Sequence, residues 1–271
     1  MSAQRRELEA RLVSGDAPDE AHLPATARYR DAARSVRFDE CARDGRMRAA
    51  AILRHAQDLA WQHSERLEYG RAWYEARGVG WVVRSIDMIL DEMPRANEAL
   101  VGTTALVGFR HVMARRRTRI FTGEGRVAAD AIIDWVMTDA AGKPTRFPAE
   151  FEPFVASIGA TFVPTKVPTP AAEAPSLKTT IALRAADVDP LGHINNAAWL
   201  EVVDEALAQL APDQLVATRR HIRLEFLALA RGATVDVLLY AHTGDAAQGY
   251  ALSVLDSDGT LLLRAETAVV S

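Results

Sequence analysis

The segment with the greatest concentration of reactive side chains is D-V-D-P-L-G-H-I-N-N at residues 187–196. It places two carboxylates, Asp187 and Asp189, and the imidazole of His193 within seven residues. A carboxylate can activate a water molecule or attack a carbonyl carbon itself. The segment leads into a predicted helix, whose first N–H groups can stabilise a developing oxyanion. These residue types in this order are suited to the hydrolysis of a thioester.

The same residue types are common in ordinary turns and helix N-caps, so a purely structural interpretation also stays open. Within the segment we predict that Asp189 is the central catalytic group, with His193 supporting it. Asp187 lies nearer the preceding strand, and we predict a structural role for it. The helix-start N–H groups are expected to hold the oxyanion, and three residues there are predicted to bind substrate: Gly192, Asn195 and Asn196.

The elements that must position this loop occur twice along the chain, in the order strand, loop, long helix and four strands. Apolar residues at three- and four-residue steps predict the helices, and runs of β-branched and aromatic residues predict the strands. The first copy is predicted as a strand at Ser35–Phe38, a helix at Met47–Leu67 and strands at Val79–Leu90, Ala99–Val107, His111–Phe121 and Arg126–Thr138. The second is a strand at Leu177–Leu183, a helix at Asn195–Leu210 and strands at His221–Leu229, Thr234–His242, Tyr250–Leu255 and Leu261–Val269.

A weak sequence echo supports the repeat. A shift of 147 residues superposes Gly45 on Gly192 and Leu53 on Leu200. A Pro-rich stretch at residues 152–176 separates the copies, and a polar helix is predicted before them at Arg5–Leu12. One long helix against an antiparallel sheet, twice, predicts the α+β class.

Composition limits the function classes. The chain has 271 residues, of which 49% are hydrophobic and 25% charged, as in globular proteins. A net charge of −4 argues against nucleic acid or an anionic membrane as a partner, and no apolar run is long enough to span a bilayer. One cysteine and no secretory or transit peptide favour a cytoplasmic location. Metal-ligand spacings and phosphate-binding loops are absent, so we expect no metal and no cofactor.

Residues 187–196 resemble the D-x-D-x-x-G-H-x-N-N motif of hotdog-fold thioesterases, and the chain from Val36 to Val270 resembles bacterial and plant-type acyl-acyl carrier protein (acyl-ACP) thioesterases. The further matches lie in both halves and in the order of that family: Phe38-Asp39-Glu40-Cys41, Asp44-Gly45-Arg46, Leu53 to Trp61 with His63, Trp81 to Arg84, Asp134 to Met137 and Arg146-Phe147-Pro148.

The resemblance implies two tandem hotdog domains, each an antiparallel sheet wrapped around a long helix. It divides the chain into an extension at 1–33, an N-terminal hotdog domain at 34–151, a linker at 152–176 and a C-terminal hotdog domain at 177–271, which carries the catalytic loop. Much of the acyl pocket would lie in the N-terminal half, where Trp81 and Trp135 are candidate lining residues. The implied reaction releases a fatty acid from acyl carrier protein, the implied partner, which carries the acyl group on phosphopantetheine.

Two positions depart from the family pattern. Leu191 stands where the family has Asn, and Leu229 stands where it has Glu. The D-x-D-P run also resembles hydroxybenzoyl-CoA-type hotdog thioesterases, in which one Asp at the Asp189 position is the main catalytic group. An acyl-CoA or aryl-CoA thioesterase and a catalytically impaired acyl-binding protein therefore remain as alternatives. In the first repeat, Ala42 and Arg46 occupy the positions of Asp189 and His193, so we expect one catalytic loop.

Other residues have a structural and a functional interpretation. Arg115, Arg117 and Arg119 alternate along a predicted strand, so they share one face. That face is either simply solvated or a docking patch for the acidic surface of acyl carrier protein. His63 and Cys41 are expected in the core. The oligomeric state is open, with a homodimer as one alternative.

Overall fold

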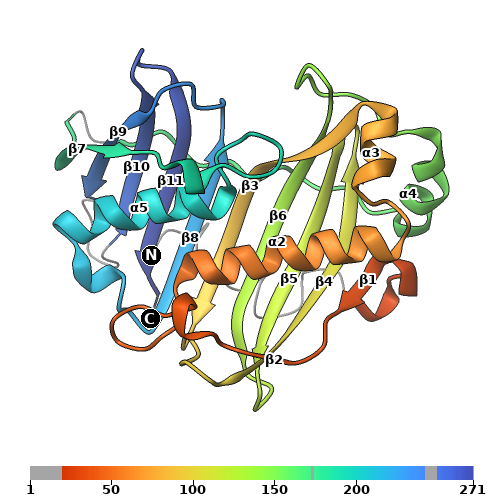
Figure 1. Cartoon of the computed structure of the whole chain (residues 1–271), viewed down its shortest axis with the longest axis horizontal. Coiled ribbons are helices and arrows are strands. Elements are labelled where there is room, and N and C mark those ends of the chain that lie inside the picture. The colour runs from red at the N-terminus through yellow and green to blue at the C-terminus, as the bar shows by residue number, and fades with distance from the viewer. Residues whose placement is uncertain (1–19, 172–173, 242–248, 271) are drawn as a thin grey trace.

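The computed structural model describes residues 20–171, 174–241 and 249–270. Within these ranges the strands form one 11-stranded sheet, ordered β1-β4-β5-β6-β3-β8-β11-β10-β9-β7, with β2 paired to β4. Every pairing is antiparallel, which confirms the predicted α+β class with antiparallel strands. Figure 1 shows the sheet as one curved layer with the two long helices, α2 and α5, across the same face.

The strands fall into two groups that meet at β3 and β8. The N-terminal group comprises β1 (Arg28–Arg30), β2 (Arg34–Ser35), β3 (Val79–Asp91), β4 (Ala99–Arg110), β5 (Met113–Thr122) and β6 (Val127–Asp139). The C-terminal group comprises β7 (Leu177–Ala182), β8 (Arg219–Phe226), β9 (Thr234–Ala241), β10 (Gly249–Asp256) and β11 (Leu261–Val269). Pairing of β3 with β8, from Ser85 opposite Glu225 to Asp91 opposite Arg219, makes the sheet continuous.

The long helices lie close to their predicted positions. Helix α2 spans Ala49–Arg66 and α5 spans Asn196–Leu210. The apolar residues that recur at three- and four-residue steps are buried in both helices, except for Leu210 of α5, which is 39% exposed. Leu210 is the last residue of its helix, and Leu207, one turn earlier, is buried in its place. Both helices contribute to the main hydrophobic core against the sheet.

The shorter elements include several that the sequence patterns did not predict. Two short helices, α3 (Arg71–Arg77) and α4 (Glu152–Ile158), follow the N-terminal repeat's long helix and its last strand. The described residues also form 3-10 turns, namely η1 (Glu20–His22), η2 (Ala25–Ala27), η3 (Phe38–Glu40), η4 (Ala149–Phe151), η5 (Ala185–Asp187) and η6 (Pro212–Gln214). The strand predicted at Ser35–Phe38 is wrong in extent, because β2 ends at Ser35 and η3 begins at Phe38. The helix predicted at Arg5–Leu12 lies outside the described residues.

Part of the predicted linker runs across the sheet face opposite the helices. Side chains alternate between the faces of a strand, so Asp134 and Glu225 point away from the core residues beside them. The N–H of Thr165 donates to Asp134 Oδ2 at 2.9 Å, and the N–H of Val167 donates to Glu225 Oε2 at 3.0 Å. These bonds hold the linker to both strand groups. In the described part of the chain, no helix has the length and apolar character needed to cross a membrane.

The loop that precedes each long helix has the same backbone hydrogen bonds in both halves. Gly45 and Gly192 both have φ of +80°, a conformation that glycine adopts without strain. Three hydrogen bonds of the first loop recur in the second with a shift of 147 residues. Ala42 N donates to Arg46 O as Asp189 N does to His193 O, both at 2.8 Å, and Gly45 N donates to Ala42 O as Gly192 N does to Asp189 O, both at 2.9 Å. In the third pair, Arg48 N donates to Glu40 O at 2.9 Å and Asn195 N donates to Asp187 O at 2.8 Å. The two loops therefore share one backbone geometry.

Candidate active site

A cavity of about 710 Å³ lies between the Asp189 loop and the N-terminal half of the molecule. Its volume is within the range of small-molecule binding sites. The loop at 189–196 forms one side, together with Phe226 and residues 228–230. Helix α2, the first half of β3 and aromatic side chains of the N-terminal half form the remainder. A loop from one repeat therefore faces a pocket built largely by the other.

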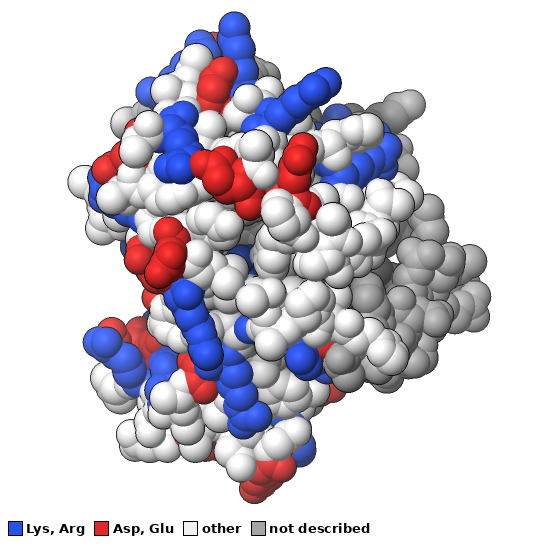
Figure 2. All heavy atoms as spheres, turned by 90° about the vertical axis from the view of Figure 1, so that its right-hand side faces the viewer, with Lys and Arg blue, Asp and Glu red and all other residues white. Residues whose placement is uncertain are grey.

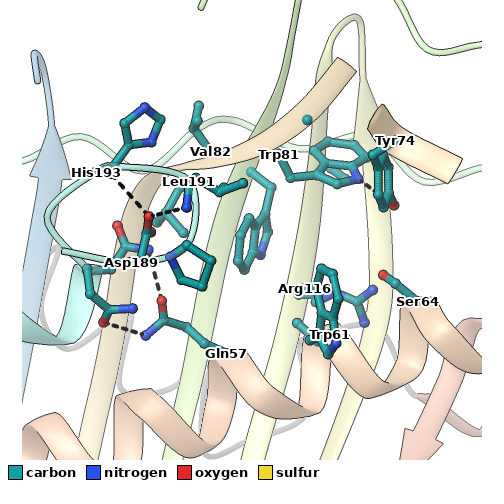
Figure 3. Close-up of a pocket in the computed structure, with 18 of the residues that line it drawn as sticks. Gln57, Trp61, Ser64, Tyr74, Trp81, Val82, Arg116, Asp189, Leu191 and His193 are labelled. Atoms are coloured by element: carbon teal, nitrogen blue, oxygen red, sulfur yellow. Dashed lines mark hydrogen bonds between the residues drawn. The ribbon is translucent and has the colours of Figure 1, made fainter. Parts of the chain in front are cut away.

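The Asp189 carboxylate is held by one oxygen only. Its Oδ1 accepts hydrogen bonds from the N–H groups of Leu191, at 2.9 Å, and His193, at 3.1 Å. Its Oδ2 has no hydrogen-bond partner among the described residues, and Asp189 lines the cavity. The loop thus fixes the carboxylate and leaves one oxygen available to a ligand or a water molecule (Figure 3).

The N–H groups expected to hold an oxyanion are mostly engaged within the loop. Those of Gly192, His193 and Asn195 donate to carbonyl or carboxylate oxygens of Asp189 and Asp187. The helix-start N–H groups that can hold an oxyanion are therefore those that the loop leaves unengaged. In the described part of the chain, the N–H groups of Ile194 and Asn196 have no such partner, and both residues line the cavity.

His193 contacts Asp189 through its backbone and not through its ring. Figure 3 shows the ring turned away from the Asp189 carboxylate. Within the described residues the imidazole has no hydrogen-bond partner, although His193 borders the cavity. The geometry leaves the imidazole free to meet a ligand at the cavity edge, and it does not form a side-chain pair with Asp189.

Gln57 on α2 links the two halves at the site. Its Oε1 accepts a hydrogen bond from Asn196 Nδ2 at 3.0 Å, and its Nε2 donates to Asn195 Oδ1 at 3.3 Å. Asn195 Oδ1 also caps α5 by accepting from the N–H of Ala197 at 2.9 Å. Gln57 was not singled out from the sequence, because its role depends on contact between helices 138 residues or more apart.

The two positions that depart from the family pattern both border the cavity. Leu191 is 60% exposed and Leu229 is 58% exposed, and each is apolar where the resemblance implies a polar group. Both therefore add apolar surface to the cavity that Asp189 also lines.

Asp187 has the structural environment that the sequence interpretation assigned to it. Its side chain is buried, and it accepts hydrogen bonds from the Arg184 backbone N–H at 2.7 Å and from the Arg184 guanidinium. Burial alone would raise the pKa of Asp187, but the hydrogen bonds from Arg184 outweigh burial and hold that pKa below its usual value. Glu40 makes the matching contacts with Arg37 and Arg34 in the other repeat.

The predicted acyl-pocket residues Trp81 and Trp135 both line the cavity. Trp81 donates a hydrogen bond from Nε1 to Tyr74 Oη at 3.0 Å. The apolar character of the wall comes mainly from aromatic side chains, namely Trp61, Tyr69, Tyr74, Trp81, Phe109, Trp135, Phe151, Phe154, Trp199 and Phe226. Among these side chains lies Arg116, which was not predicted at the site.

The arginine docking patch is not supported by the structure, because the guanidinium groups are engaged in ion pairs. Arg115 forms a bidentate pair with the fully buried Asp134, at 2.7 and 2.9 Å. Arg117, only 7% exposed, pairs with Asp130. Arg119 pairs with Glu20. On the side of the molecule in Figure 2, basic and acidic side chains are interspersed around a mostly uncharged area.

His63 and Cys41 are buried, as expected. The Cys41 thiol donates to the Arg37 carbonyl at 3.4 Å, and burial raises the pKa of the thiol. His63 packs against Tyr29, and burial lowers the pKa of its imidazole to about 4. Neither group has the environment of a nucleophile.

The comparisons with known proteins agree with this geometry. Residues 29–152 match the family model described as the acyl-ACP thioesterase N-terminal domain. The family predicted from the sequence is therefore confirmed over the N-terminal half of the chain. No curated protein sequence matches the chain.

Solved structures extend the similarity to both halves. The chain resembles a protein described provisionally as an oleoyl thioesterase from Lactobacillus plantarum, with a TM-score of 0.77 and 19% identity over 89% of this chain and 95% of that one. It resembles an acyl-ACP thioesterase from Bacteroides thetaiotaomicron, with a TM-score of 0.72 and 16% identity over 89% and 97%. It also resembles the 12:0-ACP thioesterase from Umbellularia californica, with a TM-score of 0.73 and 17% identity over 89% and 93%. The chain thus shares the fold of these hotdog thioesterases.

Proposed function

On the premise that the N-terminal half is an acyl-ACP thioesterase N-terminal domain, we propose that this protein hydrolyses acyl thioesters and releases a fatty acid from acyl carrier protein. The observation that carries the proposal is the Asp189 carboxylate, fixed through Oδ1 and free at Oδ2 beside a large apolar cavity. The match to the family and the shared fold support the reaction class.

In the proposed reaction, Asp189 Oδ2 removes a proton from a water molecule, whose oxygen attacks the thioester carbonyl carbon. The N–H of Asn196, with that of Ile194, would stabilise the resulting oxyanion. When the tetrahedral intermediate collapses, the C–S bond breaks, and the proton on Asp189 passes to the departing sulfur. Direct attack by Asp189 through an anhydride is the alternative. Label found in Asp189 after a single turnover in ¹⁸O-labelled water identifies the anhydride path, because the label enters when water attacks the Asp189 carbonyl of the anhydride.

The proposal includes a division of labour between two tandem hotdog domains. The N-terminal domain at 34–151 would hold the acyl chain, and the C-terminal domain at 177–271 would supply the catalytic loop, with a linker at 152–176. The matching hydrogen bonds of the two loops support this division, as do the two long helices on one sheet face. We place the protein in the cytoplasm, with phosphopantetheine-bearing acyl carrier protein as its partner.

A second candidate is hydrolysis of acyl-CoA or aryl-CoA thioesters. It is favoured by Leu191 and Leu229, which replace the polar residues implied by the acyl-ACP family, and by the engagement of Arg115 and Arg117 in buried ion pairs. Without those arginines, the described structure offers no basic patch on this strand for acyl carrier protein.

The test is turnover of matched acyl-ACP and acyl-CoA substrates over a series of chain lengths, measured as thiol release. A higher kcat/KM for acyl-ACP supports the first proposal, and a higher value for CoA esters favours the second. Absence of turnover on every thioester, with retained binding of acyl chains, would replace both with the binding-protein alternative.

A further inference from the structure

Arg116 is a buried cation that faces the cavity and has no carboxylate partner among the described residues. It lies on β5 between Arg115 and Arg117, so strand alternation directs it to the opposite sheet face, toward α2. Its side chain is only 6% exposed. Nη1 lies 2.8 Å from His63 Nδ1 and 3.5 Å from Thr104 Oγ1. In the part of the chain that the structure describes, Arg116 makes no ion pair, unlike its neighbours on the strand.

The histidine beside Arg116 does not neutralise it. His63 Nε2 lies 3.0 Å from the carbonyl oxygen of Thr26, so Nε2 carries the hydrogen and Nδ1 accepts from Arg116. Burial and the nearby guanidinium lower the pKa of His63 to about 4, which keeps the ring neutral at pH 7. Burial also lowers the pKa of Arg116, but only to about 10, so the guanidinium stays charged. The positive charge is therefore uncompensated by these neighbours.

Further polar groups lie beside Arg116 at this end of the cavity. Tyr74 Oη accepts a hydrogen bond from Trp81 Nε1, and the Ser64 hydroxyl lies next to the Tyr74 phenol. Figure 3 shows Arg116, Ser64 and Tyr74 across the pocket from Asp189, with the rings of Trp61 and Trp81 at the same end. The cavity thus has a reactive carboxylate at one end, a cationic group at the other and mostly apolar walls between.

A simple alkyl chain would be a poor occupant of such a pocket. Its methyl end would displace water from a charged group and return no hydrogen bond, and a buried charge without a partner is costly. A carboxylate at that position would accept charge-assisted hydrogen bonds from the guanidinium. Burial of the arginine among aromatic rings strengthens the interaction, since water competes less there.

We propose that the preferred acyl group carries an oxygen acceptor, a carboxylate above all, at the end remote from the thioester, and that Arg116 binds it with Tyr74 and Ser64 alongside. The proposal rests on the proposed function, since it assigns the substrate class of the same cavity. A dicarboxylic acid joined to the carrier thiol through one of its carboxyl groups has the required chemistry.

The test compares thioesters that differ only at the remote end. Series of ω-carboxyacyl, ω-hydroxyacyl and plain acyl thioesters, matched in chain atoms, are assayed with the wild type and with Arg116→Met, Arg116→Lys and Arg119→Met. Hydrogen bonds to charged groups contribute enough to expect about a 10- to 100-fold higher kcat/KM for the best ω-carboxyacyl substrate than for its plain counterpart. Arg116→Met should abolish or invert that preference, Arg116→Lys should retain part of it, and Arg119→Met, on the opposite sheet face, should retain all of it. A preference for ω-hydroxyacyl over ω-carboxyacyl chains would keep the oxygen acceptor but overturn the carboxylate.

Binding of the free product acids keeps this inference separate from the hydrolase proposal. Calorimetry with dicarboxylic and monocarboxylic acids of equal length requires no turnover. Tighter binding of the dicarboxylic acid, lost in Arg116→Met, supports the site even if no thioester is hydrolysed. Turnover of plain acyl thioesters at least as fast as ω-carboxyacyl thioesters at every length, together with equal binding of the two acids, would overturn the inference and leave the hydrolase proposal standing.

Discussion

Replacement of Asp189 by Asn isolates the chemistry of one oxygen atom. The side-chain oxygen of Asn can still accept from the N–H groups of Leu191 and His193, which now meet Oδ1 at 2.9 and 3.1 Å. The amide nitrogen would take the place of Oδ2, the oxygen that has no partner within the described structure. The loop should therefore keep its conformation, while the group that removes a proton or attacks the carbonyl is lost.

The expected loss follows from what is removed. A positioned general base contributes about 10²- to 10⁴-fold to the rate. At 1.36 kcal/mol for each factor of ten, the barrier should rise by about 2.7 to 5.4 kcal/mol. Among the described residues, the Asp189 side chain forms hydrogen bonds only within its own loop, so KM should change by less than the fall in kcat. The unfolding midpoint should stay close to that of the wild type.

The assay is steady-state thiol release, paired with urea unfolding to establish that each variant is folded. Asp187→Asn is the matched control, because it makes the same chemical change two residues away in a carboxylate that is paired with Arg184. Asp187→Asn should lower the free energy of unfolding by about 1 to 3 kcal/mol and affect kcat much less than Asp189→Asn does. Near-normal kcat in folded Asp189→Asn would refute the mechanism.

Three further predictions concern groups around the site. Folding lowers the pKa of His63 from 6.5 to about 4, so the neutral ring stabilises the protein fully above pH 6.5 and this contribution, about 3 kcal/mol in all, is lost as the pH falls toward 4. In urea unfolding, His63→Gln should remove this part of the dependence of the free energy of unfolding on pH. Arg115→Met should lower the free energy of unfolding by about 3 kcal/mol, because it leaves the Asp134 carboxylate buried without its ion-pair partner. A salt-dependent rise in KM for acyl-ACP alone, without this destabilisation, would instead support the docking patch. Gln57→Leu should lower kcat/KM by about tenfold, the equivalent of one lost hydrogen bond, with little change in stability. Unchanged kinetics would show that the contacts of Gln57 with Asn195 and Asn196 do not position the loop.

The sequence alone predicts the elements whose signal lies in residues close together along the chain. The two long helices were recoverable because residues such as Ile52, Leu53 and Ala56 recur on one helical face and are buried there. Gly45 and Gly192 marked both loops, because each adopts a positive φ that the turn requires. The short helix α3 was missed, since its seven residues are too few to establish a period, although Gly70 and Gly78 flank it and Gly78 has the left-handed conformation of a C-cap.

What could not be predicted depends on pairing between strands and helices. Strand alternation correctly placed Arg115 and Arg117 on one face, but only the register shows that β6 brings Asp134 opposite Arg115. The same alternation directs Arg116 toward the helix, a signal that was present in the sequence and could have drawn attention to a cation on the apolar side. Gln57 gave no such signal, because its contacts arise when α2 meets the start of α5.

The last prediction follows from the two loops having one geometry but different surroundings. Ala42 and Arg46 make the same backbone bond as Asp189 and His193, yet the cavity borders 189–196 and not residues 42–48. Arg46 instead binds Asp44 and the carbonyl of Val216.

Arg46→Ala should therefore keep kcat within about twofold of the wild-type value and lower the free energy of unfolding by about 1 kcal/mol or less, as expected for an exposed ion pair. The sharper variant is Ala42→Asp combined with Asp189→Asn, which moves the carboxylate to the equivalent position of the other repeat. It should be as inactive as Asp189→Asn alone, because the transplanted group has the right loop but no bound thioester within reach. Recovered turnover in the double variant, or loss of turnover in Arg46→Ala with substrate still bound, would mean that the N-terminal loop also faces substrate and that catalysis is not confined to one repeat.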